Sequence, residues 1–278
     1  MNFQETTITP DKRVFSINLG ELWHYRDLIQ LLVRRDFVAN YKQTILGPIW
    51  FFLQPLFTTL MFTLLFARMG DLSTDGLPPV LFYMCGITFW NYFSDCLKKN
   101  STTFIDNQSV FGKVYFPRLV LPISVSFSNT IKLGIQFLLF LATYIFFIAN
   151  GAPIGVTAYI VLLPLNVILL GLLSLGLGVL ISSLTTKYRD LRFLIDFGVQ
   201  LLMYATVIFP ASAYPSNYQW VAKINPLIPL METTKLGLLG SGSFDLYAYI
   251  GCIAVTFVFL FVGVLVFNKT EQNFMDVV

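Results

Sequence analysis

The chain has 278 residues, of which 56% are hydrophobic and only 12% are charged, and its formal net charge is +3. Soluble domains usually carry about 25% charged residues, so a soluble protein of this composition would expose too much apolar surface to water. The composition therefore excludes an ordinary soluble protein. It predicts an all-α membrane protein with about six transmembrane helices.

Several chemical functions are excluded by what the sequence lacks. His24 is the only histidine, so one chain cannot build a histidine-based metal site or acid–base pair. Cys85, Cys96 and Cys252 lie in or beside apolar stretches without metal-ligand spacing, and we predict no metal and no bound cofactor. The phosphate loop G-x-x-x-x-G-K-[ST] is absent, so this chain is not expected to hydrolyse ATP. We expect no nucleic-acid partner.

Residues 1–48 form a region without a transmembrane span. From Asn18 to Arg35, apolar and polar positions alternate with helical spacing, which predicts an amphipathic interface helix on the membrane surface. Its apolar face consists of Leu22, Tyr25, Ile29, Leu32 and Val33. The alternative is a surface helix of a globular domain, but the composition offers no such domain. The polar segment that follows ends at Leu46, Gly47 and Pro48, where we predict a gate or hinge.

Residues 49–278 form the predicted transmembrane domain. The expected spans are about 49–67, 78–97, 127–149, 157–181, 191–210 and 247–267. The third apolar segment begins at Leu119 and is too long for a hydrocarbon core of ~30 Å, so we expect its start, with Pro122, to be interfacial. Lys132 then either extends to the headgroups or has an intramembrane function. In the fourth span Ser174, Gly178 and Ser182 recur every four residues, which predicts close packing on another span.

Residues 211–246 differ from the six spans. Pro215, Pro226 and Pro229 divide this stretch into pieces too short to cross a membrane, although much of it is apolar. Broken helices that enter the bilayer and return are tolerated where protein or a water-filled cavity surrounds them. We therefore predict a re-entrant hairpin on the external side, before the last span.

Basic residues set the expected orientation, because cytoplasmic loops are enriched in Lys and Arg. With a cytoplasmic N-terminus, most of the 18 basic residues fall on the cytoplasmic side. They are Lys12, Arg13, Arg26, Arg34, Arg35, Lys42, Lys98, Lys99, Lys113, Arg118, Lys187, Arg189, Arg192 and Lys269. The prediction is a multi-pass protein with both termini in the cytoplasm. We also expect Arg192 to pair with Asp196, one turn later.

Several segments together carry a family resemblance. The run from Arg34 to Trp50, followed by Leu53-Gln54-Pro55, resembles the opening signature of permease subunits of polysaccharide ATP-binding-cassette exporters, in the second superfamily of such exporters. Residues 107–122, 207–210, 225–227 and 267–278 are similar to this family too, so the resemblance covers essentially the whole chain. The opening motif is fairly specific, whereas the later ones recur in exporters of drugs and lipids.

The resemblance implies a function and partners. Such permeases move O-antigen or teichoic-acid chains carried on a polyprenyl lipid across the inner, or cytoplasmic, membrane. They work as homodimers with two copies of a separate nucleotide-binding subunit, which uses ATP and Mg²⁺. The residues expected to couple this chain to the ATPase are Arg34, Arg35, Lys42, Phe111, Lys113, Tyr115, Phe116, Lys187 and Arg189.

Aromatic side chains are the expected lining of the path. Aromatic rings stack on the apolar faces of sugars without fixing a register, so a polymer can slide past them. The candidates lie on the first and fifth spans and just outside the membrane: Trp50, Phe51, Phe57, Phe62, Tyr204, Phe209, Tyr214, Tyr218 and Trp220. For any one ring, the alternative is a lipid-facing or interfacial position.

Three other functions remain as alternatives. A permease for drugs or lipids would have the same mechanism with another cargo. An ion-coupled carrier would need buried carboxylates, for which only Asp95, Asp196 and Glu232 qualify. A membrane-embedded lipid-sugar enzyme would need a catalytic acid cluster, and the sequence shows none.

Overall fold

The computed structural model describes residues 19–39, 47–108, 116–188, 190–214, 217 and 219–277. Every regular element within these ranges is a helix. The elements are α1 (Leu19–His24), α2 (Arg26–Ala39), η1 (Gly47–Ile49), α3 (Trp50–Phe62), η2 (Thr63–Met69), α4 (Pro79–Ser101), α5 (Thr103–Asp106), α7 (Val120–Ala149), η3 (Ala158–Leu162), α8 (Leu163–Thr185), α9 (Leu191–Met203), η4 (Tyr204–Ile208), η5 (Ala211–Ala213), α10 (Gln219–Ile224), α11 (Leu227–Leu239) and α12 (Leu246–Val277). Segments η2 and η4 are π-helical.

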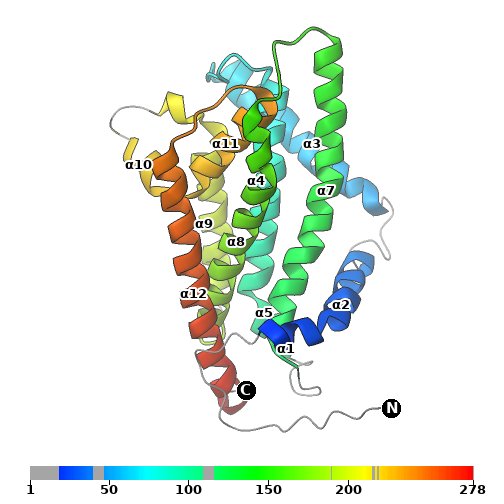
Figure 1. Cartoon of the computed structure of the whole chain (residues 1–278), viewed down its shortest axis with the longest axis vertical. Coiled ribbons are helices and arrows are strands. Elements are labelled where there is room, and N and C mark those ends of the chain that lie inside the picture. Colours follow the sequence, from blue (N-terminus) through cyan, green and yellow to red (C-terminus); the bar gives the residue numbers. More distant parts are fainter. Residues whose placement is uncertain are drawn as a thin grey trace.

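Five helical segments are long and apolar enough to cross a membrane. They are Gly47–Met69, Val120–Ala149, Ala158–Thr185, Leu191–Ile208 and Leu246–Thr270. All five coincide with spans predicted from the sequence. The long helices run side by side, with α1, α5 and the end of α12 at one end of the bundle and α11 toward the other (Figure 1). We call the end with α1, α5 and the end of α12 the basic end, and the end with α11 the hairpin end.

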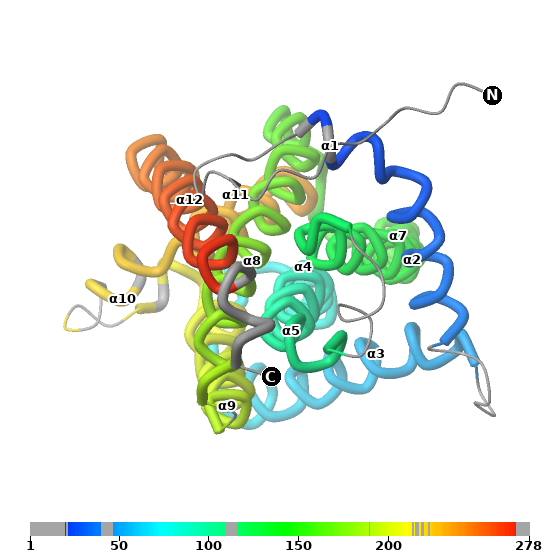
Figure 2. Tube along the Cα trace, turned by 90° about the horizontal axis from the view of Figure 1, so that it is seen from below, coloured from blue at the N-terminus to red at the C-terminus, as the bar shows by residue number. Residues whose placement is uncertain are grey.

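Helix α4 is the centre of the bundle. It lies between α7 and α8 when the molecule is viewed along its long axis (Figure 2), and it contacts both. Its 23 residues cover the predicted second span, and most of them are buried. Polar residues such as Ser94 and Asn100 lower its hydropathy, and other helices shield them from the surroundings. Length and hydropathy together therefore do not single out α4 as a span.

The predicted four-residue repeat on α8, Ser174, Gly178 and Ser182, packs closely against α4 and the residues that follow it. A Cβ atom on Gly178 would collide with the side chain of Asn100. The hydroxyl of Ser182 accepts a hydrogen bond from the backbone N–H of Phe104, at 3.3 Å. On the other side of α8, Gly176 and Gly263 bring α8 and α12 together, since a Cβ on either would collide with the partner backbone. Small residues thus fix α4, α8 and α12 as one tightly packed unit.

A second apolar cluster lies at the basic end. Phe104 of α5 stacks on Phe267 of α12, with ring centroids 4.4 Å apart, and Leu32 anchors α2 to the same cluster. The predicted helix over residues 18–35 is in fact two helices, broken at Tyr25 and continuing to Ala39. Its predicted apolar face packs mainly on protein, because Leu22, Tyr25 and Ile29 also contact this cluster.

Two further details correct the sequence-based prediction. The third apolar segment is one continuous helix, α7, whose first turn contains Pro122. A proline is tolerated there because the N–H groups of a first helical turn have no partner within the helix. Asp196 does not pair with Arg192 but with Lys98 of α4, at 3.5 Å between Oδ1 and Nζ.

Candidate transport pathway and hairpin-end polar cluster

Helices α3 and α9 carry an exposed apolar face. Both border the same side of the bundle in Figure 2, one at each end of that side. On α3, Trp50 is 51% exposed and Phe57 is 57% exposed, and on η4 Tyr204 is 38% exposed. Further exposed residues of these helices are Leu60, Met61, Leu64, Phe193, Leu194, Phe197 and Leu201. An apolar face of this extent is suited to lipid or to a second protein surface.

The remaining residues predicted to line the path occupy different positions. Phe62 is buried and packs edge-on against Tyr83 of α4, with centroids 6.0 Å apart, so it is not part of the exposed face. Phe51 is half-buried, and the Nζ atom of Lys132 lies 5.4 Å from its ring centroid. Trp220 is exposed on α10. Tyr218 lies outside the described residues.

At the hairpin end, Phe209 and Tyr214 form a pair of rings 5.9 Å apart. The Tyr214 hydroxyl donates a hydrogen bond to the Ala205 carbonyl on η4. Burial, and next the negative charge of Glu232, raise the pKa of Tyr214. The hydroxyl therefore keeps the proton that it donates, and it secures the segment after α9 to the end of that helix.

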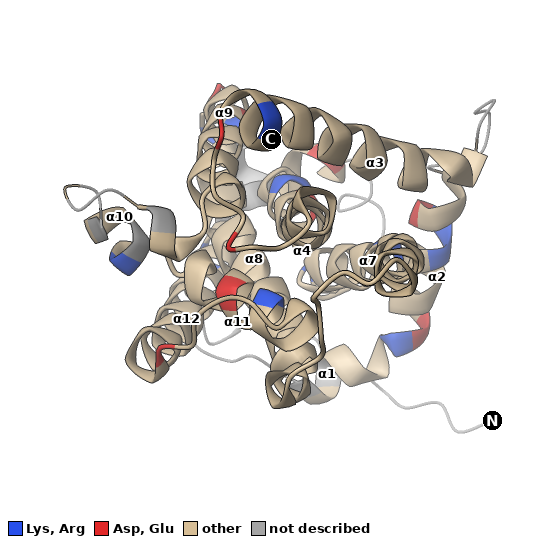
Figure 3. Cartoon of the chain, turned by 90° about the horizontal axis from the view of Figure 1, so that it is seen from above, with Lys and Arg blue, Asp and Glu red and all other residues tan. Residues whose placement is uncertain are grey.

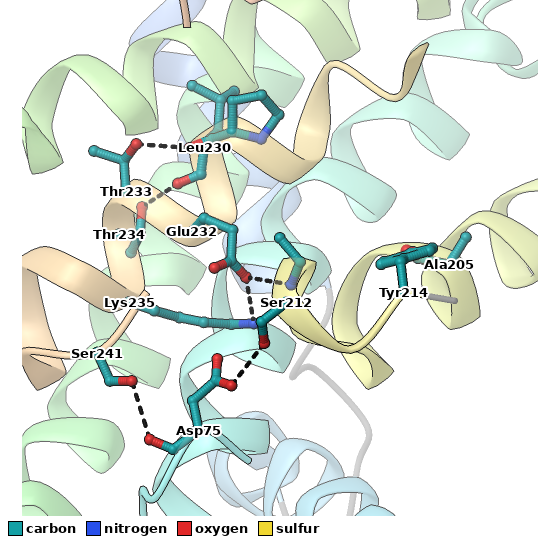
Figure 4. Close-up of polar contacts among 12 residues, drawn as sticks. Asp75, Ala205, Ser212, Tyr214, Leu230, Glu232, Thr233, Thr234, Lys235 and Ser241 are labelled. Carbon is teal, nitrogen blue, oxygen red and sulfur yellow. Dashed lines mark hydrogen bonds and ion pairs between the residues drawn. The ribbon is translucent and has the colours of Figure 1, made fainter. Parts of the chain in front are cut away.

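A buried ion pair occupies α11. The Nζ atom of Lys235 lies 3.2 Å from Oε1 of Glu232, and the two side chains are 2% and 6% exposed (Figure 4). Lys235 also lies over the ring of Phe82 on α4, 4.0 Å from the centroid. Glu232 accepts a hydrogen bond from the backbone N–H of Ala211, at 3.4 Å. Each charge thus has a partner beyond the other, as buried charges require.

Asp75 joins three segments at the same end. Its Oδ1 atom accepts a hydrogen bond from Ser212 Oγ at 2.8 Å, and its backbone carbonyl accepts one from Ser241 Oγ at 3.2 Å (Figure 4). Asp75 has a φ of 53°, in the left-handed region that Asp tolerates better than most residues. We call Asp75, Ser212, Glu232, Lys235 and Ser241 the hairpin-end cluster. It connects the loops that follow α3, α9 and α11.

A polar network attaches α11 to α8 and α12. Asn166 of α8 donates to Thr234 Oγ1 at 3.0 Å, and it accepts from the Tyr249 hydroxyl at 2.6 Å. All three side chains are buried. The backbone of residues 155–157 also bonds to the last turn of α11, where the N–H of Thr157 donates to the Gly237 carbonyl at 3.1 Å. Helix α11 is therefore fixed to the bundle on two sides.

The residues predicted to couple to an ATPase lie at the basic end, where the structure describes them. Arg34 and Arg35 are exposed on α2, and Arg35 pairs with Asp36 at 2.8 Å. Lys187 is exposed after α8. Phe116 is buried in the second apolar cluster, so it is not part of an exposed docking surface. Lys42, Phe111, Lys113, Tyr115 and Arg189 lie outside the described residues.

Of the predicted hinge residues, Gly47 and Pro48 are described and Leu46 is not. Gly47 has a φ of +50°, in the left-handed region that glycine adopts without strain. It begins the short helix η1, which leads directly into α3.

Two features of the basic end were not predicted. Lys132 of α7 forms an ion pair with Asp95 of α4, and both side chains are largely covered. An apolar groove of about 920 Å³ runs between α2 and the first turns of α7, with Arg26 and Arg34 among its lining residues.

No signal in the sequence could have paired Lys132 with Asp95, because they lie on different helices. The Glu232–Lys235 pair did have one: opposite charges three residues apart in an apolar stretch.

The charged side chains that the structure describes do not gather into a group that could hold a metal ion. No three His, Cys, Asp or Glu side chains converge on one point in the described part of the chain. Viewed from the hairpin end (Figure 3), acidic and basic residues are dispersed among several helices, with one of each sign on α11.

Comparisons with known proteins agree with this geometry. Residues 27–239 match the ABC-2 type transporter family. The chain is 25% identical over 262 residues to the O-antigen export system permease protein RfbA of Klebsiella pneumoniae, covering 94% of this chain and 97% of the relative. It is 26% identical over 261 residues to the protein of the same name from Myxococcus xanthus, covering 92% and 97%. The family match spans most of the chain, which therefore belongs to the ABC-2 type transporter family.

Proposed function

We propose that this protein is the membrane-spanning subunit of an ATP-driven exporter of polysaccharide carried on a polyprenyl lipid, of the O-antigen or teichoic-acid type. The observation that carries the proposal is the end-to-end similarity to relatives named as O-antigen export permeases. A permease for an unrelated cargo would also match the family model. It would not be expected to resemble O-antigen export permeases over almost its full length.

The topology that fits this role has six spans. Helix α4 is the sixth, because its 23 residues suffice to cross a bilayer and its polar groups face other helices. Helices α1 and α2 lie at the basic end as an interface element. Helices α10 and α11 form the re-entrant hairpin, which the hairpin-end cluster attaches to the loops after α3 and α9. Both termini are cytoplasmic, in the inner membrane.

The exposed face of α3 and α9 supports a homodimer with the path between its two copies. Most polar side chains inside one subunit are buried between its helices, where they do not face a hydrophilic polymer. Two copies that meet through this face form a conduit lined by Trp50, Phe57 and Tyr204, without placing charges in lipid. The energy comes from two copies of a separate nucleotide-binding subunit, which dock at the basic end near Arg34, Arg35 and Lys187.

The test is reconstitution. The chain and a candidate ATPase encoded beside it are purified together and placed in vesicles with a polyprenyl-linked oligosaccharide. We expect ATP-dependent movement of the glycan, and no ATP hydrolysis by this chain alone. Transport of drugs or phospholipids without the glycan would instead support the alternative cargo, and ATP hydrolysis by the isolated chain would contradict the division of labour.

A further inference from the structure

The described part of the chain holds six buried side-chain polar atoms without a hydrogen-bond partner, and five lie on three helices that pack on one another. They are Oγ1 of Thr59 and Thr63 on α3 and η2, the hydroxyl of Tyr83 on α4, and Nε2 of Gln136 and the hydroxyl of Tyr144 on α7. We call these five side chains the unpaired set. Buried polar groups are normally hydrogen-bonded, so each exception needs a reason.

Three members of the unpaired set lie at one depth. Near the basic end, Lys132 pairs with Asp95 and lies beside Phe51, so α3, α4 and α7 meet there. Thr63, Tyr83 and Tyr144 each lie twelve residues from one of those three contacts, toward the hairpin end. At 1.5 Å per residue, this places the backbone positions of these three residues about 18 Å along their helices from the common contact.

The two threonines are unusual within this chain. Thr58, Thr88 and Thr143 each donate their hydroxyl hydrogen to the carbonyl four residues earlier in their own helix. Thr59 and Thr63 make no such bond, although both lie in helical turns. The hydroxyls of Thr59 and Thr63 therefore do not use the local acceptor that the other three threonines use.

Aromatic rings pack on two members of the unpaired set, Tyr83 and Tyr144. Tyr83 packs on Phe62 and Phe66 of α3 and η2, with centroids 6.0 and 6.4 Å away. On α7, Phe137 and Phe140 stack with centroids 5.7 Å apart. Sugars present apolar C–H faces and a rim of hydroxyl groups, so aromatic faces beside free hydrogen-bonding groups match their chemistry.

Little of helix α3 is buried within the subunit. Only 17% of its apolar window is buried, similar to the 22% of α7 and of α9 and well below the 44% of α8. Pro55 removes one backbone hydrogen bond from its interior. The helix then continues as the π-helix η2, a form that is rare and frequently marks functional sites.

We infer that the surfaces of α3, α4 and α7 that are in contact in this structure become a second part of the lining of the sugar path. During transport α3 moves away from α4, and the unpaired set then binds sugar hydroxyls and water. The free energy lost by burying these groups without partners favours that movement. This inference rests on the proposed function and names residues, inside the subunit, that would contact the polymer.

The first test removes hydroxyls without changing shape. Tyr83→Phe and Thr59→Val should leave the melting temperature of the purified complex unchanged or raised, and should lower glycan export several-fold. The matched control is Tyr249→Phe, whose hydroxyl is paired with Asn166, and which should lower the melting temperature. Full export by both variants, or a Tyr83→Phe loss of stability equal to that of the control, would overturn the inference.

The second test measures exposure directly. Thr63→Cys is introduced after Cys85, Cys96 and Cys252 are replaced by alanine, and the complex is treated with a small water-soluble thiol reagent. Labelling should be several-fold faster during ATP turnover than without nucleotide, whereas Leu170→Cys, buried on α8, should stay unreactive. Equal rates at Thr63→Cys would refute the movement. The labelling needs no polymer, so its result does not depend on what the protein transports. The proposed function is contradicted by a different result, namely that the wild type exports no glycan.

Discussion

Lys235 and Glu232 form a buried ion pair one turn apart on α11, with 3.2 Å between Nζ and Oε1. Neither charge reaches solvent, because the two side chains are only 2% and 6% exposed. The pair lies where α11 meets Phe82 of α4 and Ala211 after α9. It therefore helps to hold α11 against two other parts of the chain.

We predict that breaking this pair destabilises the protein strongly. Glu232→Gln or Lys235→Met alone leaves one buried charge without its partner, which costs about 3–5 kcal/mol. The double variant should recover most of this loss, since it buries no charge. Thermal unfolding of the detergent-purified protein measures both effects. Single variants as stable as the wild type would show that the pair is solvated.

Close packing of α8 on α4 gives a second prediction. Gly178→Val places side-chain atoms where Asn100 lies, and overpacking of this kind costs about 1–3 kcal/mol. The yield of folded, monodisperse protein should fall accordingly. The control is Gly134→Val on α7, where a side chain would meet nothing within 4 Å. An equal loss of folded protein in both variants would contradict the prediction, because it would show that valine in a membrane helix lowers the yield regardless of packing.

The exposed aromatic face gives a third prediction. Phe57→Ala together with Tyr204→Ala should reduce glycan export without reducing the amount of protein in the membrane, because both rings are exposed and few contacts are lost. Phe257→Ala and Phe261→Ala serve as controls, since these rings are about as exposed as Phe57 and more exposed than Tyr204, and both lie on α12. An export defect of the same size in the controls would mean that the α3 and α9 face has no special role.

The same face predicts a crosslink between copies. Cysteines placed at Phe57 and Leu201, in a chain without native cysteines, should form a disulfide or a short bismaleimide bridge between subunits. Mixing two separately tagged chains, each with one cysteine, distinguishes bridges between copies from bridges within one. Crosslinks confined to single chains would exclude the dimer through this face.

Coupling at the basic end is the last prediction. Arg34→Gln and Lys187→Gln should lower ATP hydrolysis by the assembled complex, because both charges are exposed where an ATPase would dock. Arg68→Gln, at the far end of α3 and η2, is the matched loss of charge and should have no effect. Co-purification together with the ATPase rate separates failed docking from failed coupling. Normal rates in both variants would place the docking surface elsewhere.

The sequence was a good guide to the long apolar helices, because length and hydropathy determine what a bilayer accepts. It was a poor guide to which face of each helix is buried. Phe57 and Phe62 are five residues apart and so point in different directions, but both sides of α3 are apolar and no periodicity separates them. One ring is exposed and the other is buried against Tyr83.

Polar contacts between distant segments were also beyond the reach of the sequence. Ser212 and Asp75 are 137 residues apart, and Asp95 and Lys132 are 37 apart, so only the packing of the helices brings them together. The predicted pairing of Arg192 with Asp196 was wrong for the same reason, since Asp196 pairs with Lys98 of a neighbouring helix, at 3.5 Å between Oδ1 and Nζ. Local spacing predicts partners only when no other helix offers one.

The central position of α4 bears on how the protein is made. A segment that carries Asn91, Ser94, Asp95 and Asn100 enters a membrane reluctantly when it is alone, because each polar side chain raises the free energy of insertion. In the proposed six-span topology, α4 as a newly made span depends on α3, which precedes it, or on α7, which follows it and supplies Lys132 to Asp95. In that topology biogenesis is cooperative: α4 stays in the bilayer only once its neighbours arrive, and a mutation in α7 can cause α4 to be lost before the protein ever folds.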